Sequence, residues 1–198
     1  LSLNKKSLFF LNSFGSLYSI NNESLEINWF INLNKSMDLN PSNIFFATQI
    51  INKKNNIIVS TSKDTYIIDS SSGLILNKFN FSSSLKPIIY NDYIFFITNN
   101  NYLICIDLTS KKILYSLNIN EKIAEYTKTK KGNLFPLNLM ILNNKIFIFL
   151  KNSHFIKFDL NGDLIELSKL PSRVNSEIIL VNEIIFYLNK KNNLIMIN

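Results

Sequence analysis

A hairpin recurs along this chain at intervals of about forty residues. Its clearest copies are two apolar runs joined by an Asn-containing turn, at residues 89–96, 141–148 and 180–187. In each copy a further apolar run ends sixteen residues after the turn Asn: Asn91 leads to Asp107, Asn143 to Asp159, and Asn182 to Asn198. A unit that repeats at this period predicts a repeat architecture rather than a single-site enzyme domain.

Two looser copies, beginning near Lys5 and Ile50, complete the pattern. The terminal residues of the five units are then Asn21, Asp69, Asp107, Asp159 and Asn198, spaced 48, 38, 52 and 39 residues apart. This spacing is typical of the blades of a β-propeller.

The composition of each unit indicates β-strands. Ile, Phe, Val and Tyr dominate short apolar runs between polar breaks. Asn in the connecting turns tolerates the positive φ that tight hairpins demand, and the chain has only 4 Gly for that role. No helix is predicted. Each unit is expected to form four antiparallel strands, and the fold class is all-β.

A second turn follows the terminal Asp or Asn of four units. An Asp in this position can accept backbone N–H bonds from residues two or three positions further on, and Ser or Gly suits the tightest position. The residues assigned to this structural motif are Asn21, Trp29, Asp69, Gly73, Asp107, Tyr115, Asp159 and Gly162.

The pattern Asp-x-x-[Ser/Thr]-Gly-x-x-x-Trp resembles the tryptophan-docking repeat of the pyrroloquinoline-quinone (PQQ)-like propellers. Asp69 and Gly73 keep the turn, Trp29 keeps the docking aromatic, and Tyr115 substitutes for it. Asn77 and Leu167, at the equivalent positions of two other units, do not supply a docking aromatic. The resemblance covers essentially the whole chain through its repeat rhythm and implies a β-propeller of four-stranded antiparallel blades.

Among such propellers the chain is most similar to the carboxy-terminal half of the BamB family of outer-membrane assembly factors, which ends on a bare apolar strand as residues 193–198 do. We expect one propeller domain over 1–198, an incomplete fragment with about four and a half blades of a seven- or eight-bladed ring. A short complete ring of four or five blades is the alternative. The blades are placed around 1–33, 44–81, 86–119, 137–170 and 177–198.

The net charge of +7 raises the question of a polyanion site. The Lys residues are scattered, most aromatics lie inside apolar strand runs, and Arg173 is the only Arg, whereas Arg is the usual residue for specific base contacts. No nucleic-acid partner is predicted. No run reaches the roughly eighteen apolar residues of a membrane span, and the stretch after Lys5 and Lys6 is interpreted as a strand rather than a signal peptide.

Residues with catalytic chemistry are few. Cys105 lies in an apolar strand, where a thiol is desolvated and inert, and His154 has no second ligand at metal spacing. Asp69, Asp107 and Asp159 occupy equivalent positions of separate blades, so a turn-forming role explains each one. No catalytic, cofactor or metal site is predicted. The adjacent cysteines of many quinoprotein dehydrogenases are also missing from the sequence.

The excursion from Glu121 to Pro136 accounts for the longest spacing and is polar and basic. Loops of this kind present side chains to partners on a rigid scaffold, and a solvated loop without a partner is the plainer alternative. The candidate partner-binding residues are Tyr126, Lys128, Lys130, Lys131 and Phe135.

The resemblance implies a non-catalytic scaffold in the periplasm, associated with the outer membrane through an anchor or partner outside this chain. It would present inter-blade loops to the barrel-assembly machinery or to unfolded β-rich clients. Two alternatives stay open, since fold alone does not select a function: a PQQ-dependent oxidoreductase or a degenerate relative, and a propeller sensor domain of a larger protein.

Overall fold

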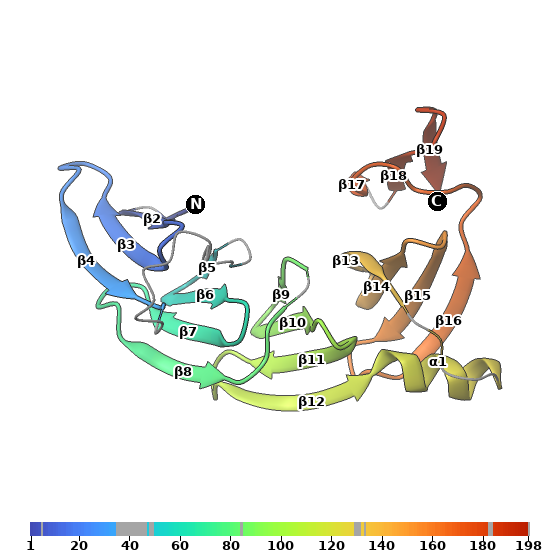
Figure 1. Cartoon of the computed structure of the whole chain (residues 1–198), viewed down its shortest axis with the longest axis horizontal. Helices are drawn as coiled ribbons and strands as arrows, with labels where there is room; N and C mark the ends of the chain where they lie inside the picture. Colours follow the sequence, from blue (N-terminus) through green and yellow to red (C-terminus); the bar gives the residue numbers. More distant parts are fainter. Residues whose placement is uncertain are drawn as a thin grey trace. The chain divides into compact units, whose positions relative to one another are not determined.

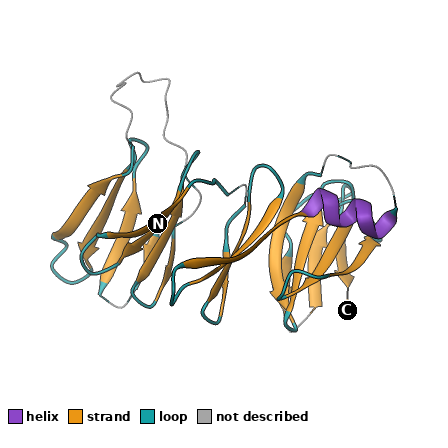
Figure 2. Cartoon of the chain, turned by 90° about the horizontal axis from the view of Figure 1, so that it is seen from below, coloured by secondary structure: helices purple, strands orange, loops and turns teal. Residues whose placement is uncertain are grey.

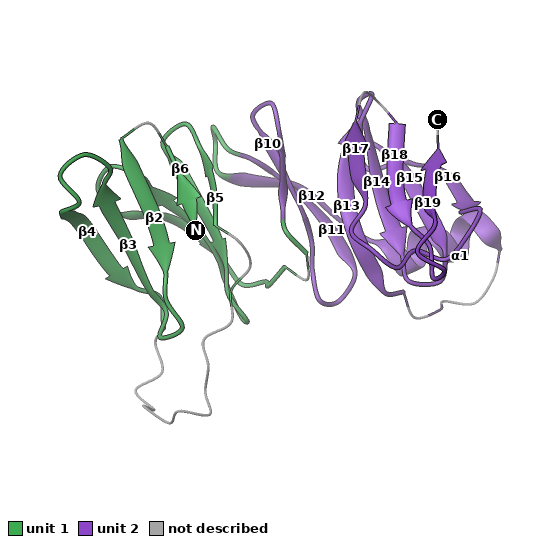
Figure 3. Ribbon diagram, turned by 90° about the horizontal axis from the view of Figure 1, so that it is seen from above, with its two compact units in different colours: residues 1–86, 108–111 green, residues 87–107, 112–198 purple. Residues whose placement is uncertain are grey.

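The computed structural model describes residues 1–4, 6–34, 47, 50–83, 85–128, 132, 134–181 and 184–197. Within these residues the chain forms antiparallel sheets and one short α-helix, drawn in purple in Figure 2. It divides into two compact units, which Figure 3 distinguishes by colour. Unit 1 comprises residues 1–86 and 108–111, and unit 2 comprises residues 87–107 and 112–198.

Unit 1 contains two four-stranded sheets, in the orders β1-β2-β3-β4 and β5-β6-β7-β8 (Figure 1). The strands of the first are β1 (Ser2–Leu3), β2 (Ser7–Leu11), β3 (Ser16–Asn21) and β4 (Ile27–Asn32). Those of the second are β5 (Ile51–Lys53), β6 (Asn56–Ser60), β7 (Thr65–Asp69) and β8 (Ile75–Phe79).

Unit 2 contains two further four-stranded sheets and one three-stranded sheet. The first is formed by β9 (Ile88–Tyr90), β10 (Tyr93–Ile97), β11 (Tyr102–Asp107) and β12 (Lys112–Asn118). The second is formed by β13 (Pro136–Leu142), β14 (Lys145–Leu150), β15 (His154–Asp159) and β16 (Leu164–Lys169). The third is formed by β17 (Ile179–Val181), β18 (Ile184–Leu188) and β19 (Leu194–Ile197). The prediction of an all-β fold built from four-stranded antiparallel sheets is confirmed, with three described strands in the last sheet.

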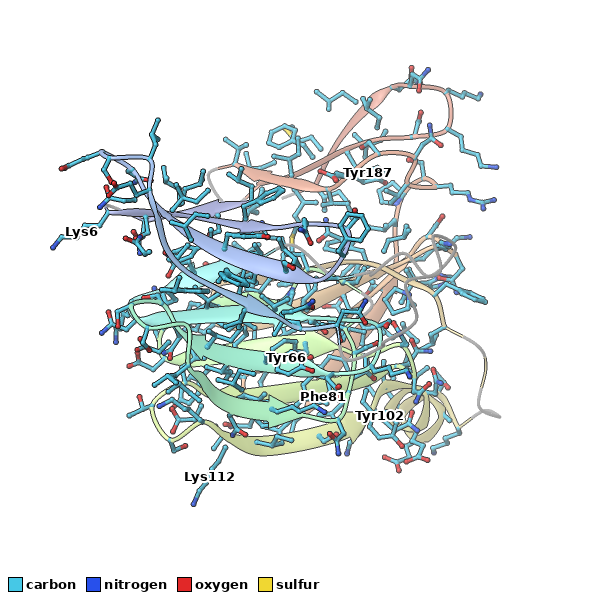
Figure 4. The ribbon with its side chains drawn as sticks, turned by 60° about the vertical axis from the view of Figure 1, so that its left-hand side comes forward. Lys6, Tyr66, Phe81, Tyr102, Lys112 and Tyr187 are labelled. Atoms are coloured by element: carbon cyan, nitrogen blue, oxygen red, sulfur yellow. The ribbon has the colours of Figure 1, made fainter. Side chains whose placement is uncertain are left out.

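Burial explains why the inner strands are continuous apolar runs. In β6, β7, β10, β11 and β14 nearly every residue is buried, because both faces of the sheet are covered there. The fourth strands β4, β8 and β12 are largely exposed. Figure 4 shows Lys112, at the start of β12, pointing away from its strand. The core of each unit therefore lies between the inner strands of successive sheets.

Asn supplies the positive φ of several hairpin turns. Asn91 joins β9 to β10 with φ 54°, and Asn143 and Asn144 join β13 to β14 with φ 48° and 58°. Two consecutive residues with positive φ match the right-handed twist of the flanking strands. Asn182, in the corresponding turn of the last sheet, lies outside the described residues.

The fourth strand of every four-stranded sheet carries an irregularity. The register between the third and fourth strands shifts at Ser19/Ile20, Ile67/Ile68, Cys105/Ile106 and Lys157/Phe158. Such bulges bend an edge strand and increase its twist. By contrast, β18 and β19 pair without a shift from Leu188 opposite Leu194 to Ile185 opposite Ile197.

The prediction that the chain contains no helix is wrong. Helix α1 (Ile119–Thr127) lies between β12 and β13. Its N-cap Asn118 accepts backbone N–H bonds from Asn120 and Glu121 through Oδ1, at 3.0 and 3.4 Å. An Asn followed three residues later by Glu is a helix-start pattern that the sequence already displayed. No helix among the described residues is long and apolar enough to cross a membrane.

Candidate interaction surface

At three places a side chain of a fourth strand reaches the turn before another fourth strand. Trp29 on β4 donates from Nε1 to the carbonyl oxygen of Ser70, at 3.1 Å. Tyr115 on β12 donates its hydroxyl proton to the carbonyl of Leu160, at 3.0 Å. Asn77 on β8 does the same with its amide, which lies 2.7 Å from the Lys111 carbonyl within unit 1. The sequence had suggested no docking contact for Asn77.

Two of these contacts require glycine in the receiving turn. Gly73 has φ 75°, and a Cβ at this position would lie 2.7 Å from the ring of Trp29. Gly162 has φ 94°, and its Cβ would lie 2.4 Å from Leu117 and 3.2 Å from the ring of Tyr115. Both glycines therefore combine a left-handed backbone with close approach of a neighbouring side chain.

The equivalent position on β16 is Glu166, not Leu167 as the sequence spacing suggested. We call Trp29, Asn77 and Tyr115 the docking residues. Each of them is the fourth-strand residue that pairs with the third strand just after the bulge, and on β16 the residue in this place is Glu166, which pairs with Lys157. The shift arises because the turn is one residue shorter: Asp69 N–H bonds Leu74 O, whereas Asp159 N–H bonds Asp163 O.

Glu166 differs chemically from the other three docking residues. Its carboxylate accepts hydrogen bonds from the Ser168 hydroxyl and from Lys157 Nζ, the latter at 3.4 Å. These contacts, that of Ser168 above all, hold the pKa of Glu166 below its usual range. Trp29, Asn77 and Tyr115 donate to a carbonyl, whereas an ionised carboxylate only accepts. Glu166 is therefore suited to an N–H donor or a cation.

Carboxylate and amide side chains organise the receiving turns. Asp69 Oδ1 accepts backbone N–H bonds from Ser71 and Ser72, at 3.0 and 2.8 Å, and bonds from both hydroxyls. These bonds, led by the Ser71 hydroxyl, lower the pKa of Asp69. Asn21 Oδ1 likewise accepts the N–H groups of Glu23 and Ser24, and Asp159 Oδ1 those of Asn161 and Asp163. Asp107 lies at the end of β11, opposite Lys112 in the register of β11 and β12.

The predicted partner-binding excursion is a helix followed by an anchored segment. Tyr126 lies on α1 with 52% of its surface exposed, and Lys128 is the left-handed C-cap, with φ 53°. Phe135, 59% exposed, lies beside Lys151, whose Nζ is 5.9 Å from the ring centroid. Among the described residues no hydrogen bond or ring contact joins Tyr126 and Phe135. Lys130 and Lys131 lie outside the described residues.

Hydrogen bonds to backbone carbonyls anchor both ends of this segment within unit 2. The Ile119 N–H donates to Asn101 O (3.0 Å), Asn101 Nδ2 donates to Leu134 O (3.1 Å), and Lys151 N–H donates to Phe135 O (3.0 Å). Glu121, Lys122, Glu125 and Lys128 balance one another in charge, and Lys122 and Glu125 form an ion pair at 3.9 Å. The described part of the excursion is therefore neutral rather than basic.

A cavity of about 560 Å³ lies between the sheet β13–β16 and the sheet β17–β19. Its walls are mostly apolar, and Phe147, Phe149 and Phe155 form a cluster with ring centroids 5.9 to 6.4 Å apart. Lys157 and Glu166 supply the charges, with Lys157 Nζ 5.5 Å from the Phe147 ring centroid. Nothing in the sequence marked this cavity, because its walls come from residues far apart in the chain.

The other residues considered for chemistry have local explanations. Cys105 is buried on β11, and desolvation, together with the charge of Asp107, raises its pKa to about 12. His154 Nδ1 lies 3.0 Å from the carbonyl of Asn152. Within the part of the chain that the structure describes, no three His, Cys, Asp or Glu residues are grouped to hold a metal ion.

Sequence comparisons identify no relative. No protein-family model matches the chain, and no curated protein matches it. The repeat rhythm therefore has no support from a family model, including one for PQQ-like repeats.

Solved structures match the fold of the chain. The crystal structure of BamB from Moraxella catarrhalis has a TM-score of 0.72 and 10% identity, covering 99% of this chain and 56% of that one. The computationally designed Ika8 protein has a TM-score of 0.71 and 10% identity, covering 98% and 56%. The designed Ika4 protein has a TM-score of 0.57 and 12% identity, covering 77% and 90%.

The chain thus spans about 56% of the length of BamB and of Ika8. Identities of 10 and 12% show the fold and no more. The antiparallel four-stranded sheets, the docking contacts between them and these structural matches together give the chain the fold of a β-propeller, similar to that of BamB.

Proposed function

We propose that this chain is part of a non-catalytic propeller scaffold that acts in the periplasm in the assembly of outer-membrane β-barrel proteins. The observation that carries the proposal is the structural match to BamB over 99% of the chain. Its partners would be components of the barrel-assembly machinery or unfolded β-rich clients. Membrane association would come from an anchor or partner outside this chain.

The scaffold would act by holding exposed side chains in fixed positions. The buried inner strands of unit 2 make a rigid base, from which α1 and the anchored residue Phe135 present the exposed side chains of Tyr126 and Phe135. Aromatic residues are favoured at protein interfaces because they bury a large area at a low cost in conformational entropy. The two exposed aromatic side chains would supply apolar contact area for recognition.

The test is capture of partners from the protein's own cell envelope by the purified protein. We expect components of the barrel-assembly machinery to be recovered with the wild type. They should be lost when Tyr126→Ala and Phe135→Ala are combined, or when residues 121–136 are replaced by a short Gly-Ser linker.

The matched control combines Leu74→Ala and Ile113→Ala, two exposed apolar residues outside the segment 121–136. Equal recovery with the control and with the Tyr126/Phe135 variant would contradict the role of this surface. Failure to recover any barrel-assembly component with the wild type would contradict the proposed function itself.

A further inference from the structure

Asn161 is the only asparagine in the 198-residue chain that a glycine follows. Both residues belong to the turn between β15 and β16, which also receives the hydroxyl of Tyr115. Asparagine before glycine is the pair that most readily closes to a cyclic imide, because glycine has no side chain to hinder its backbone nitrogen. The structure places this reactive pair inside a docking contact.

The side chain of Asn161 is free to move. The residue is exposed, and its side-chain amide makes no hydrogen bond within the part of the chain that the structure describes. Its backbone N–H is held by Oδ1 of Asp159, at 2.9 Å. By contrast, Oδ1 of Asn12 accepts the N–H groups of Phe14 and Ser16, at 3.0 and 2.9 Å, which fixes that side chain. An exposed amide without such bonds can rotate towards the next backbone nitrogen.

The nitrogen that would attack the amide is weakly held. The Gly162 N–H donates to the carbonyl oxygen of Asp159 at 3.2 Å, the upper end of the ordinary range for this kind of bond. Attack requires the N–H to leave this carbonyl and to lose its proton, so the turn must first open locally. The rate of reaction therefore follows the fraction of molecules in which the turn is open.

Two side chains of β12 keep the turn closed. The Tyr115 hydroxyl donates to the Leu160 carbonyl at 3.0 Å, and the Tyr115 ring lies over Gly162. Leu117 also approaches the position that a Cβ of Gly162 would occupy. Gly162 is buried in this way, whereas Asn161 next to it is exposed. The docking contact therefore opposes the opening that the reaction needs.

We propose that Asn161 is a site of spontaneous modification, at which the chain forms isoaspartate at a rate set by the Tyr115 contact. The Gly162 nitrogen loses its proton to the solvent and bonds to Cγ of Asn161, while the bond from Cγ to the side-chain nitrogen breaks and releases ammonia. Water then opens the cyclic imide. Addition of water at the former backbone carbonyl gives isoaspartate, and addition at Cγ gives aspartate. Water is the only co-reactant, and the proposal does not depend on the scaffold function.

Isoaspartate at this position would weaken the docking contact. It adds a methylene group to the backbone between Leu160 and Gly162. It also adds a negative charge between Asp159 and Asp163. With a longer backbone, the Leu160 carbonyl and the glycine no longer keep the spacing at which Tyr115 meets both of them. The modified chain should therefore hold this turn against β12 less tightly.

The test follows conversion at Asn161 in the whole folded chain, at neutral and at mildly alkaline pH. Trypsin releases residues 158–169, in which Asn161 is the only Asn, and isoaspartyl methyltransferase labelling with mass spectrometry distinguishes isoaspartate from aspartate. Residues 152–157, in which Ser153 follows Asn152, are the internal control and should stay unmodified over the same period. We expect isoaspartate in 158–169, formed faster at the higher pH because the attacking nitrogen must lose a proton.

Tyr115→Phe removes the bond to Leu160 and should raise the rate of conversion about fivefold, the factor by which a hydrogen bond of ordinary net strength changes an opening equilibrium. Tyr102→Phe, at an exposed tyrosine on β11, is the matched control and should leave the rate unchanged. The chain unfolded in urea should convert fastest, because no turn protects it. Asn161→Gln should suppress the product, since its longer side chain closes this ring poorly.

The effect on docking is measured by comparing two forms of the protein. A fraction enriched in isoaspartate should melt at a lower temperature than Asn161→Asp, which carries the same added charge without the extra methylene. Equal melting temperatures would contradict the effect on docking. Equal rates in the wild type and Tyr115→Phe, or in the folded and the unfolded chain, would overturn control by the Tyr115 contact. Conversion in urea with none in the folded wild type or Tyr115→Phe would overturn the site itself.

Discussion

The Trp29 and Tyr115 contacts perform the same task with different chemistry. Both residues lie beside the bulge of a fourth strand, donate to a turn carbonyl and pack over a glycine. Trp29 adds a large ring, 6.1 Å from that of Phe9, in the core of unit 1. Tyr115 in unit 2 presents a smaller ring and an ionisable hydroxyl. Where the receiving turn contains a glycine, the contact therefore combines a hydrogen-bond donor with an aromatic ring, and either Trp or Tyr can supply both.

The largest effect is expected from Trp29→Ala. The change removes the ring that packs against Phe9 and Gly73 and should lower the free energy of unfolding by about 3 kcal/mol. Urea unfolding followed by circular dichroism measures it, since Trp29 is the only Trp and its fluorescence is lost. A loss below about 1 kcal/mol would contradict the packing role of the ring.

Gly73→Ala should come next, with a loss of about 2 kcal/mol, because the new Cβ meets the Trp29 ring and the backbone has positive φ. Trp29→Ala combined with Gly73→Ala removes the steric part of this cost and leaves the backbone part. The double variant should therefore lose less than the sum of the single variants. Strict additivity would mean that ring and turn are not in contact.

Tyr115→Phe should cost about 1 kcal/mol, because it deletes the hydroxyl that donates to Leu160 O and retains the ring over Gly162. The matched change, Tyr102→Phe, affects an exposed hydroxyl on β11 and should have little effect. Thermal unfolding of both variants, compared with the wild type, gives the difference. Equal values for the two would indicate that the Leu160 contact contributes nothing.

The smallest expected effect is a dependence of stability on pH that only the Tyr115 contact has. Burial above all, together with nearby Cys105 and Asp159, raises the pKa of Tyr115 above the ordinary value of about 10. The unfolded chain then releases this proton at lower pH than the folded chain, so stability falls as pH rises above about 10. Tyr115→Phe should flatten this alkaline slope, which urea unfolding between pH 9 and about 11 measures. Trp29→Phe, which removes no ionisable group, should leave the slope unchanged.

Local patterns in the sequence were sufficient to predict the sheets. Asn91 and Asn143 adopt positive φ because their side chains tolerate it, and Asp69 and Asp159 organise turns by accepting N–H groups nearby in the chain. The helix-start pattern of Asn118 and Glu121 was equally local, but the strand repeat around it masked it.

The contacts between sheets could not be predicted in the same way. Asn77 reaches Lys111, and a side chain whose neighbours lie this far along the chain leaves no local pattern. The docking position on β16 is Glu166 rather than Leu167 because the turn after Asp159 is one residue shorter than the turn after Asp69. A prediction that counts a fixed number of residues from the Asp misses this difference. The cavity beside Glu166 is likewise lined by residues from several separate strands of unit 2.

The receiving half of each docking contact is a backbone carbonyl, and this has a consequence for how such chains diverge. Every residue brings a carbonyl to the turn, so substitution there leaves the acceptor in place, and the donor has alternated here among Trp, Asn and Tyr. Mutation can then erase the residue pattern while the spatial arrangement persists. A chain that no family model matches can in this way still superimpose on BamB over nearly its whole length.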